Sequence, residues 1–365
     1  MSRTRIGVIG AGWFATTNHI PIFARRPDVE LAAVCRLGQD KLRQIKDHFG
    51  FRFATEDYRE LLDQDLDAVL VSSPHDLHYE HASAALERRL HVMCEKPMTL
   101  QGRRAWDLVR LAREHNRHLL VPYGWHYKKF VQEAKKIMAD DAVGEIEYVM
   151  CHMASPTKDF FAGSGTVPSE WAPTLSAPEP STWQNRARGG GYGHGQISHS
   201  SALMLWLTGL RARQVAARMT YTNSKVDMYD CATVTFQNGA IGVLSGAATL
   251  PNGDPFQVDL RIFGSHGVLL LDAEVGRERV QLRRHDGKHW EFSVSAGEGG
   301  YSCEGPPNRF VELVQGPGEN WSPGEVAAAS VELIEAMYLS AGDGGRAVEV
   351  SERQSDLRYE AAGGY

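Results

Sequence analysis

Several features are scarce or missing in this sequence, and each absence excludes a class of protein. The five cysteines stand singly with no CxxC pair, so we expect reduced thiols, no disulfide framework and no metal site. No apolar run approaches the roughly 20 residues of a membrane span, so no membrane contact is expected. The first residues lack the apolar core and cleavage site of a signal peptide, which predicts a cytoplasmic location.

Charge of one sign is also not concentrated anywhere in the chain. The formal net charge is −6, and the lysines and arginines are dispersed. The sequence therefore indicates no basic patch for the phosphate backbone, and no nucleic-acid partner is expected. Hydrophobic residues make up 42% of the chain and charged residues 23%, which is typical of a globular protein. A chain of 365 residues exceeds one ordinary core, so we predict two domains, 1–122 and 123–365.

The predicted first domain alternates short apolar runs with amphipathic segments, as in a doubly wound α/β fold. Buried parallel strands are predicted at 5–9, 31–35, 67–73, 90–94 and 118–122. Helical segments are predicted between them at 13–26, 40–49, 58–62, 77–88 and 99–115. This rhythm indicates a Rossmann domain.

After residue 122 the pattern changes to many strands with few helices. After a helix at 129–138, strands are predicted at 146–153, 214–220, 232–236, 241–247, 257–263, 268–271, 280–283 and 290–294. Hairpin signals such as Asn238-Gly239 indicate a large, mostly antiparallel sheet in an α+β domain. Helices at 200–207 and 325–340 can cover one face, which leaves the open face for a homodimer or homotetramer. The proline-rich segment 155–187 is predicted to be a long loop.

A glycine-rich turn follows the first predicted strand and opens a helix, which is the context of a dinucleotide-binding fingerprint. Gly10 permits the tight turn, Gly12 lets the backbone approach a pyrophosphate, and Ala15 allows close packing of helix on strand. Trp13 and Phe14 lie within the same segment and are expected at the cofactor. Glycines also make plain turns, but the surrounding βαβ pattern favours NAD(P) binding.

The end of the second predicted strand bears on the choice of cofactor. A carboxylate there would bind a ribose 2′-hydroxyl, yet the sequence has Cys35-Arg36-Leu37 with no acid. Arg36 can pair with a 2′-phosphate, so NADP is expected to bind at least as well as NAD. The alternative is a solvent-exposed arginine without a role in binding.

Three further segments carry candidate site residues. Ser73-Pro74 with His78, and Glu95-Lys96, follow two successive strands at the carboxyl edge, where α/β sheets bind ligands. A triple glycine, 189–191, leads to His194, Gln196 and His199 in the second domain.

Together with GAGWFA, GEIEYV and NRFVELV, these segments make the chain similar to the Gfo/Idh/MocA oxidoreductases, which include glucose-fructose oxidoreductase and inositol dehydrogenase. The resemblance covers essentially the whole chain. It implies a sugar, glycoside or cyclitol substrate, Lys96 near the reacting hydroxyl, His199 as the second catalytic group, and Pro74 beside the nicotinamide. Ser73, His78, Glu95 and Lys96 are then also expected to line the cofactor site.

Two departures from the family pattern stand out. The aspartate four residues before the histidine is replaced by Gly195, and His126 stands where many relatives carry arginine. Gln196 or His194 could orient His199 instead, although glutamine supplies no charge. His126, Tyr127, Trp183, His194 and Gln196, together with Lys96 and His199, are therefore the candidate substrate contacts. For Tyr127, Trp183 and Trp125, packing at the domain interface is an equally good interpretation.

The sequence thus predicts reversible hydride transfer between the nicotinamide of NAD(P) and a secondary hydroxyl or ketone. Lys96 and His199 would share the proton, and no metal is needed. Two alternatives stay open. One is a glycosidase that oxidises its substrate transiently with tightly held NAD, and the other is a non-catalytic NAD(P)-binding protein.

Overall fold

The computed structural model describes residues 3–163, 167, 172 and 175–350. The first part of the chain forms a six-stranded parallel sheet in the order β3-β2-β1-β4-β5-β6. Its strands are β1 (Thr4–Ile9), β2 (Val29–Cys35), β3 (Phe53–Thr55), β4 (Ala68–Val71), β5 (His91–Cys94) and β6 (Leu119–Leu120). This order is the doubly wound Rossmann topology, which confirms the predicted fold class.

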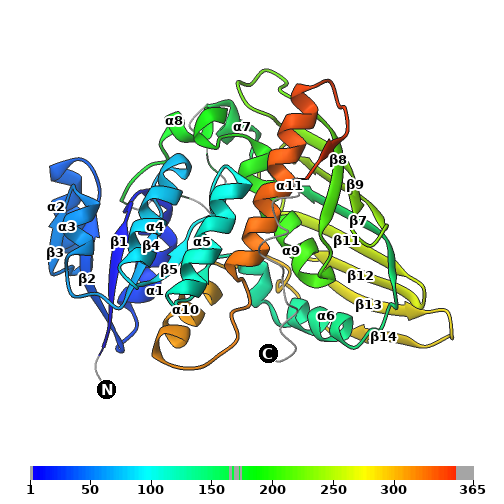
Figure 1. Cartoon of the computed structure of the whole chain (residues 1–365), viewed down its shortest axis with the longest axis horizontal. Helices are drawn as coiled ribbons and strands as arrows, with labels where there is room; N and C mark the ends of the chain where they lie inside the picture. Colours follow the sequence, from blue (N-terminus) through cyan, green and yellow to red (C-terminus); the bar gives the residue numbers. More distant parts are fainter. Residues whose placement is uncertain (1–2, 164–166, 168–171, 173–174, 351–365) are drawn as a thin grey trace.

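Helices cover both faces of this sheet (Figure 1). They are α1 (Ile20–Ala24), α2 (Gln39–Phe49), α3 (Tyr58–Leu62), α4 (His78–Glu87) and α5 (Gly102–Glu114). The predicted helix 13–26 is instead a π-helical turn, Ala15–His19, followed by the short α1. Strand β3 was not predicted, because only three residues pair there and they lack an alternating pattern.

The second part forms a nine-stranded sheet in the order β14-β13-β12-β11-β7-β10-β9-β8-β15. Only the β7–β10 pair is parallel among these described strands. The strands are β7 (Ile146–Ala154), β8 (Ala212–Thr220), β9 (Tyr229–Phe236), β10 (Ile241–Ala247), β11 (Gln257–Gly264), β12 (Gly267–Ala273), β13 (Arg279–Arg284), β14 (His289–Phe292) and β15 (Val348–Glu349). The large, mostly antiparallel sheet is therefore confirmed.

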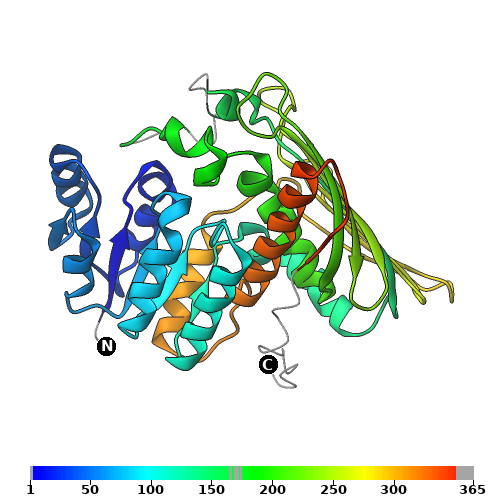
Figure 2. The same cartoon turned by 45° about the horizontal axis from the view of Figure 1, so that its top comes forward.

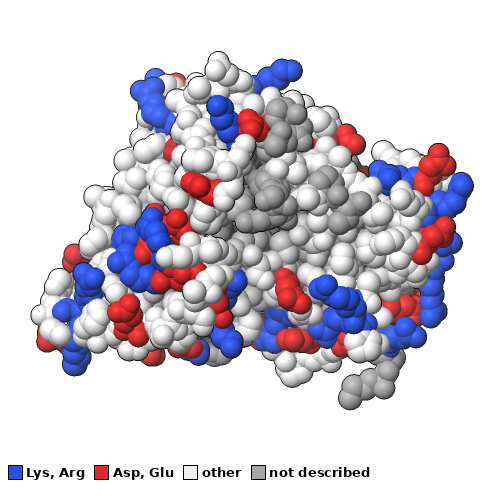
Figure 3. Space-filling model, turned by 180° about the vertical axis from the view of Figure 1, so that it is seen from behind, with Lys and Arg blue, Asp and Glu red and all other residues white. Residues whose placement is uncertain are grey.

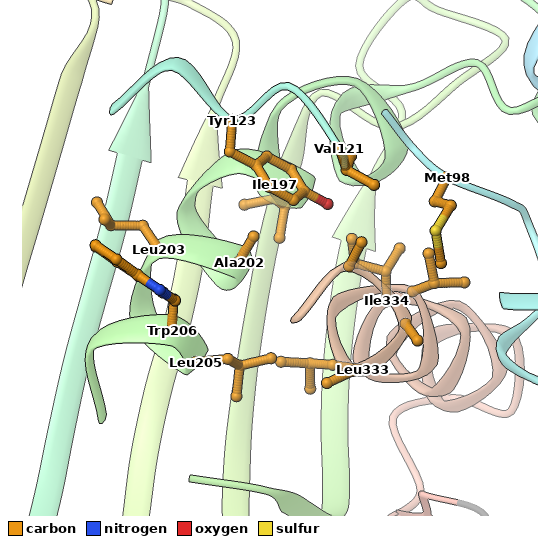
Figure 4. Packing of buried hydrophobic residues seen from close by; sticks show 14 of the residues in the cluster. Met98, Val121, Tyr123, Ile197, Ala202, Leu203, Leu205, Trp206, Leu333 and Ile334 are labelled. Atoms are coloured by element: carbon orange, nitrogen blue, oxygen red, sulfur yellow. The ribbon is translucent and has the colours of Figure 1, made fainter. Parts of the chain in front are cut away.

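Two long helices cover one face of this sheet and join it to the Rossmann domain. They are α9 (Ser198–Thr208) and α11 (Gly324–Gly342), with α6 (Lys129–Ala139) near the far strands (Figure 1). Figure 4 shows Ala202 and Leu205 of α9 facing Leu333 and Ile334 of α11. Because α11 also contacts α5 of the first domain, one hydrophobic core spans both parts of the chain.

One helix of the second half packs back on the Rossmann sheet. Helix α10 (Gly305–Gln315) buries Phe310 and Val311 in the same cluster as Ile6 and Val8 of β1. Figure 2 shows α10, in orange, against the first domain, where it contacts α1, β1 and β5. The predicted domain boundary at residue 122 stays a prediction. After residue 304 the chain returns to the Rossmann sheet, because α10 packs against it.

No helix of the described residues covers the other face of the large sheet (Figure 1). Its side chains include an ion-pair network in which Arg261 and Arg279 both contact the carboxylate of Asp272 at 2.6 Å. Seen from behind, the molecule shows lysine and arginine interspersed with acidic residues and broad uncharged areas (Figure 3). None of the helices in the described ranges has the length and hydropathy that a membrane crossing needs.

Candidate active site

A cavity of about 1040 Å³ runs along the carboxyl edge of the Rossmann sheet and into the second domain. Gly12 and Arg36 line one end of it, which we call the cofactor end. Lys96 and His199 line the other end, which we call the reacting end, together with Trp125, Gln196, Tyr301 and Cys303. The predicted edge of the sheet is therefore where the cavity lies.

The glycine-rich turn leaves room for a dinucleotide. Gly10 has a φ of +89°, and a Cβ there would lie 2.3 Å from the backbone nitrogen of Ser73, so only glycine fits. A Cβ on Gly12 would meet nothing within 4 Å, although the residue lines the cavity. The turn is thus packed on its protein side and open on its cavity side, as a pyrophosphate cradle requires.

Two π-helical turns lie on either side of the Glu95–Lys96 dipeptide. His19, at the end of the first turn, places Nε2 2.5 Å from Oε1 of Glu95. The second turn, Gly193–Ile197, presents the Gly195 carbonyl, which accepts a hydrogen bond of 2.9 Å from Lys96 Nζ. Such turns are rare and occur often at functional sites. The dipeptide is therefore held on both sides.

Lys96 and His199 are both more than nine-tenths buried. Desolvation lowers the pKa of Lys96, against the nearby charge of Glu95. Desolvation, with the charge of Lys96, holds the pKa of His199 well below its usual value, so this imidazole is neutral. Its Nδ1 is buried without a hydrogen-bond partner in the described part of the chain. The reacting end thus combines a neutral imidazole with an amine that deprotonates more easily than usual.

The position of the family aspartate is occupied by an aromatic ring. A Cβ on Gly195 would lie 2.7 Å from Cζ of Phe161, which is fully buried. Lys96 therefore faces a neutral backbone carbonyl where the usual family pattern has a carboxylate. Neither Gln196 nor His194 has a hydrogen bond to His199 among the described residues. Among the described residues, the Phe161 ring fills the Cβ position of an aspartate, and no carboxylate is hydrogen-bonded to Lys96 Nζ.

Aromatic residues that the sequence analysis did not select also line the cavity. Phe160 packs against Trp183 with ring centroids 4.8 Å apart, and against Trp13 at 5.8 Å. Phe256, Tyr301 and Cys303 also line the cavity but come from connecting segments without a motif. Phe160 lies in α7 (Lys158–Ala162) and Trp183 in α8 (Pro180–Trp183), both inside the predicted loop 155–187. Residues 164–166, 168–171 and 173–174 of that loop lie outside the described ones.

Three predicted substrate contacts lie outside this cavity. His126 is fully buried, stacks on Trp206 and bonds Trp321 O through Nδ1 at 2.8 Å. The hydroxyl of Tyr127 pairs with Ser322 Oγ at 2.7 Å. His194 stacks on Tyr338, with ring centroids 4.5 Å apart. Each of these side chains contacts other protein groups and does not line the cavity.

The other predicted site residues line the cavity, apart from Ala15, which is buried in the core beside the turn. Gly10, Trp13, Phe14, Ser73, Pro74, His78 and Glu95 all line the cavity, as do Trp183 and Gln196. His78 links two of the segments, because its ring nitrogens lie 2.8 Å from the carbonyl oxygens of Ser73 and Pro97.

At the cofactor end, Arg36 and Lys41 line the cavity without bonding a carboxylate in the described chain. Arg36 donates to Ala11 O at 3.3 Å and to Ser176 Oγ at 3.1 Å. Lys41 donates to Leu175 O at 3.0 Å. Both cations are therefore available to an anionic ligand. Glu56 lines the same end but caps the backbone N–H of Gly38 at 2.5 Å.

The Rossmann fold and the cavity at its carboxyl edge are those of a dinucleotide-binding protein, and comparison with known proteins identifies an NAD-binding oxidoreductase and its family. Residues 4–123 match the model of the oxidoreductase family with an NAD-binding Rossmann fold, and residues 131–270 match the GFO/IDH/MocA C-terminal domain. The chain belongs to the GFO/IDH/MocA family, which confirms the resemblance seen in the sequence.

Individual relatives are distant. The D-glucoside 3-dehydrogenase of Escherichia coli is 32% identical over 40% of this chain and 42% of its own length. The myo-inositol 2-dehydrogenase of Thermotoga maritima is 26% identical over 73% of this chain and 75% of its own. A levoglucosan dehydrogenase structure in complex with NADH and L-sorbose has a TM-score of 0.76 at 20% identity, covering 96% of this chain and 100% of that one. That likeness shows the fold.

Proposed function

We propose that this protein transfers a hydride reversibly between a nicotinamide dinucleotide and a secondary carbinol of a sugar, glycoside or cyclitol. The observation that carries the proposal is the pairing of Lys96 and His199 at one end of a cavity whose other end is the glycine cradle. The named relatives act on such compounds, which supports the substrate class.

The cradle of Gly10 and Gly12, with Ser73 and Pro74 beside it, would hold the dinucleotide, which supplies the hydride acceptor or donor when bound. Lys96 performs the proton chemistry. In oxidation its neutral amine accepts the hydroxyl proton, and in reduction its ammonium returns the proton to the carbonyl oxygen. His199 is neutral, so it orients the hydroxyl by hydrogen bonding without competing as a cation.

For the cofactor, we propose that NADP binds at least as well as NAD. Arg36 and Lys41 are two cations at the cofactor end whose hydrogen bonds go to neutral groups. A 2′-phosphate would give each of them a charged partner.

For assembly, we propose that the uncovered face of the nine-stranded sheet joins subunits into a homodimer or homotetramer. The cytoplasmic location stays a prediction.

The direct test is stoichiometric reduction of NAD or NADP by a panel of sugars, glycosides and cyclitols, followed by absorbance. Oxidation of a panel member with equal formation of reduced cofactor supports the proposal. Release of an aglycone without net change in cofactor would indicate the glycosidase alternative. Dinucleotide binding without any turnover across the panel, in both directions, would indicate a binding protein.

A further inference from the structure

Few polar groups are free at the reacting end. Trp125 donates its indole N–H to Gly299 O at 3.2 Å, and Tyr301 donates its hydroxyl to Pro122 O at 2.8 Å. His75 lines the cavity beside Trp183, and its Nδ1 lies 2.9 Å from the carbonyl oxygen of Gly189. This leaves Lys96, Gln196 and His199 as the strong hydrogen-bonding side chains among the residues that define the reacting end. Three such groups match one reacting hydroxyl and its two ring neighbours.

The charged residues around this end are already paired. Glu95 is engaged by His19 and by the backbone N–H of Lys96 at 3.0 Å. Arg188 lines the cavity but is paired with Asp76 at 3.2 Å. A ring with hydroxyls on every carbon would therefore lose water from several of them without gaining a protein partner, which is unfavourable.

An apolar wall adjoins the reacting atom. We define the aromatic wall as Trp13, Phe160 and Trp183, whose rings contact one another and line the cavity. The Trp183 ring centroid lies 5.9 Å from Lys96 Nζ, so the wall begins beside the reacting hydroxyl. A flat apolar group on the substrate would remove this surface from water and stack on it.

We propose, resting on the function above, that the substrate is a glycoside with an aromatic aglycone. The sugar ring presents three neighbouring hydroxyls to Lys96, Gln196 and His199, and the aglycone lies on the aromatic wall. The hydroxyl is oxidised as described above, and the glycosidic bond is kept. A fully hydroxylated cyclitol makes the contacts with Lys96, Gln196 and His199 but none with the aromatic wall, so it is the poorer substrate.

The test compares phenyl and methyl D-glucopyranosides, in both anomers, with myo-inositol. Saturating NAD or NADP is used, and kcat/KM is measured for each compound. We expect the better phenyl glucoside to exceed its methyl counterpart by tenfold or more, as burial of one aromatic ring provides. We expect myo-inositol to be slower than the phenyl glucoside by a similar factor or more.

Variants show whether the wall causes the preference. Phe160→Ala should bring the phenyl-to-methyl ratio close to one, and Phe160→Leu should give an intermediate ratio while keeping the core filled. Phe292→Ala, in β14 and outside the cavity, is the matched control and should leave the ratio unchanged. Melting temperatures identify a variant that fails to fold, in which case the Leu variant decides.

The outcomes separate this inference from the proposed function. If kcat/KM for methyl glucoside or myo-inositol equals that for phenyl glucoside, the proposed function holds and the inference of an aromatic aglycone is wrong. If no sugar is oxidised, binding of phenyl glucoside in the presence of cofactor is measured by calorimetry. Loss of that binding in Phe160→Ala supports the wall, whereas equal binding overturns it. A change confined to cofactor affinity would assign the wall to the nicotinamide and overturn the proposal.

Discussion

The two ends of the cavity differ in how strongly water screens their charged groups. At the cofactor end Arg36, Lys41 and Glu56 are partly exposed, so water screens their interactions. At the reacting end Lys96 and His199 are less than one-tenth exposed. The same charge change should therefore cost far more at the reacting end than at the cofactor end.

The two ends also differ in what stabilises them. The cofactor end is built on a backbone turn and on charges that water solvates in any case. At the reacting end the buried amine of Lys96 is bonded to one neutral carbonyl, so the loss of its hydration is only partly compensated. The variants below test that difference, from the largest expected effect to the smallest.

Lys96→Met should give the largest loss. Turnover should fall by about 10²-fold or more, the usual contribution of a positioned acid or base. Because desolvation lowers the pKa of Lys96, its charged form is disfavoured in the folded state. Removing the amine should therefore leave the melting temperature unchanged or raise it at neutral pH, where the unfolded chain binds the proton more tightly.

Kinetics with both cofactors and thermal melts measure the two effects. Lys129→Met, an exposed lysine at the start of α6, is the matched control and should change neither. Near-normal turnover in Lys96→Met would remove Lys96 from the mechanism. A clear fall in melting temperature would show instead that the amine stabilises the fold.

Gly195→Asp should be the next most harmful change, although it restores the family residue. The new Cβ would collide with Phe161, and overpacking of a buried site costs about 1–3 kcal/mol. A carboxylate near Lys96 also favours the ammonium, which raises the pKa of Lys96. We expect activity to fall tenfold or more at neutral pH and the optimum for oxidation to move to higher pH.

Gly195→Ala separates packing from charge, since it adds the Cβ alone. The double variant Gly195→Asp/Phe161→Ala makes room for the carboxylate and should recover part of the melting temperature while keeping the shifted pH profile. Higher kcat/KM in Gly195→Asp alone would mean that the site only lacks its acid and has not been rebuilt around Phe161.

The sequence predicts the cofactor end better than the reacting end, for a physical reason. The cradle is contiguous in the chain and follows from glycines whose backbone geometry is required locally, as at Gly10. The Rossmann strands follow from continuous apolar runs because both faces of a parallel sheet are buried. In contrast, β3 and α10 depend on tertiary packing and were not predicted.

The reacting end is assembled from segments between residues 96 and 303, which no local pattern joins. Lys96 and His199 were found through the family motifs, but Phe160 and Tyr301 had no such signal. His126 and Tyr127 are close in sequence to Trp125, yet only Trp125 lines the cavity. The short helical segment Gly124–Tyr127 turns the other two side chains toward Trp206 and Ser322.

Arg36→Asp tests the cofactor end and should act on one cofactor. Loss of a charge-assisted hydrogen bond, about 1.5–3 kcal/mol, corresponds to roughly tenfold to hundredfold in affinity for NADP. NAD should be spared or improved, because a carboxylate accepts from its free 2′-hydroxyl. Calorimetric titration of both cofactors measures this. A wild type that prefers NAD tenfold, with the ratio unchanged in the variant, would show that Arg36 binds no phosphate.

Lys41→Gln should give the smallest effect. Lys41 lies in the first turn of α2, where its amine bonds Leu175 O and Gln44 Oε1, and water surrounds much of it. A screened cation of this kind should change NADP affinity only severalfold and NAD affinity very little. The effect should shrink as salt rises from low to physiological concentration, whereas the loss in Lys96→Met should not, because that amine is buried.

Lys46→Gln, on the same helix but outside the cavity, is the control for a general change in charge. Titrations of both cofactors at two salt concentrations measure this. An equal loss of affinity for NAD and NADP, or a loss of affinity that salt leaves unchanged, would contradict the prediction. Lys41 would then contribute through Leu175 and the packing of that segment rather than through a phosphate.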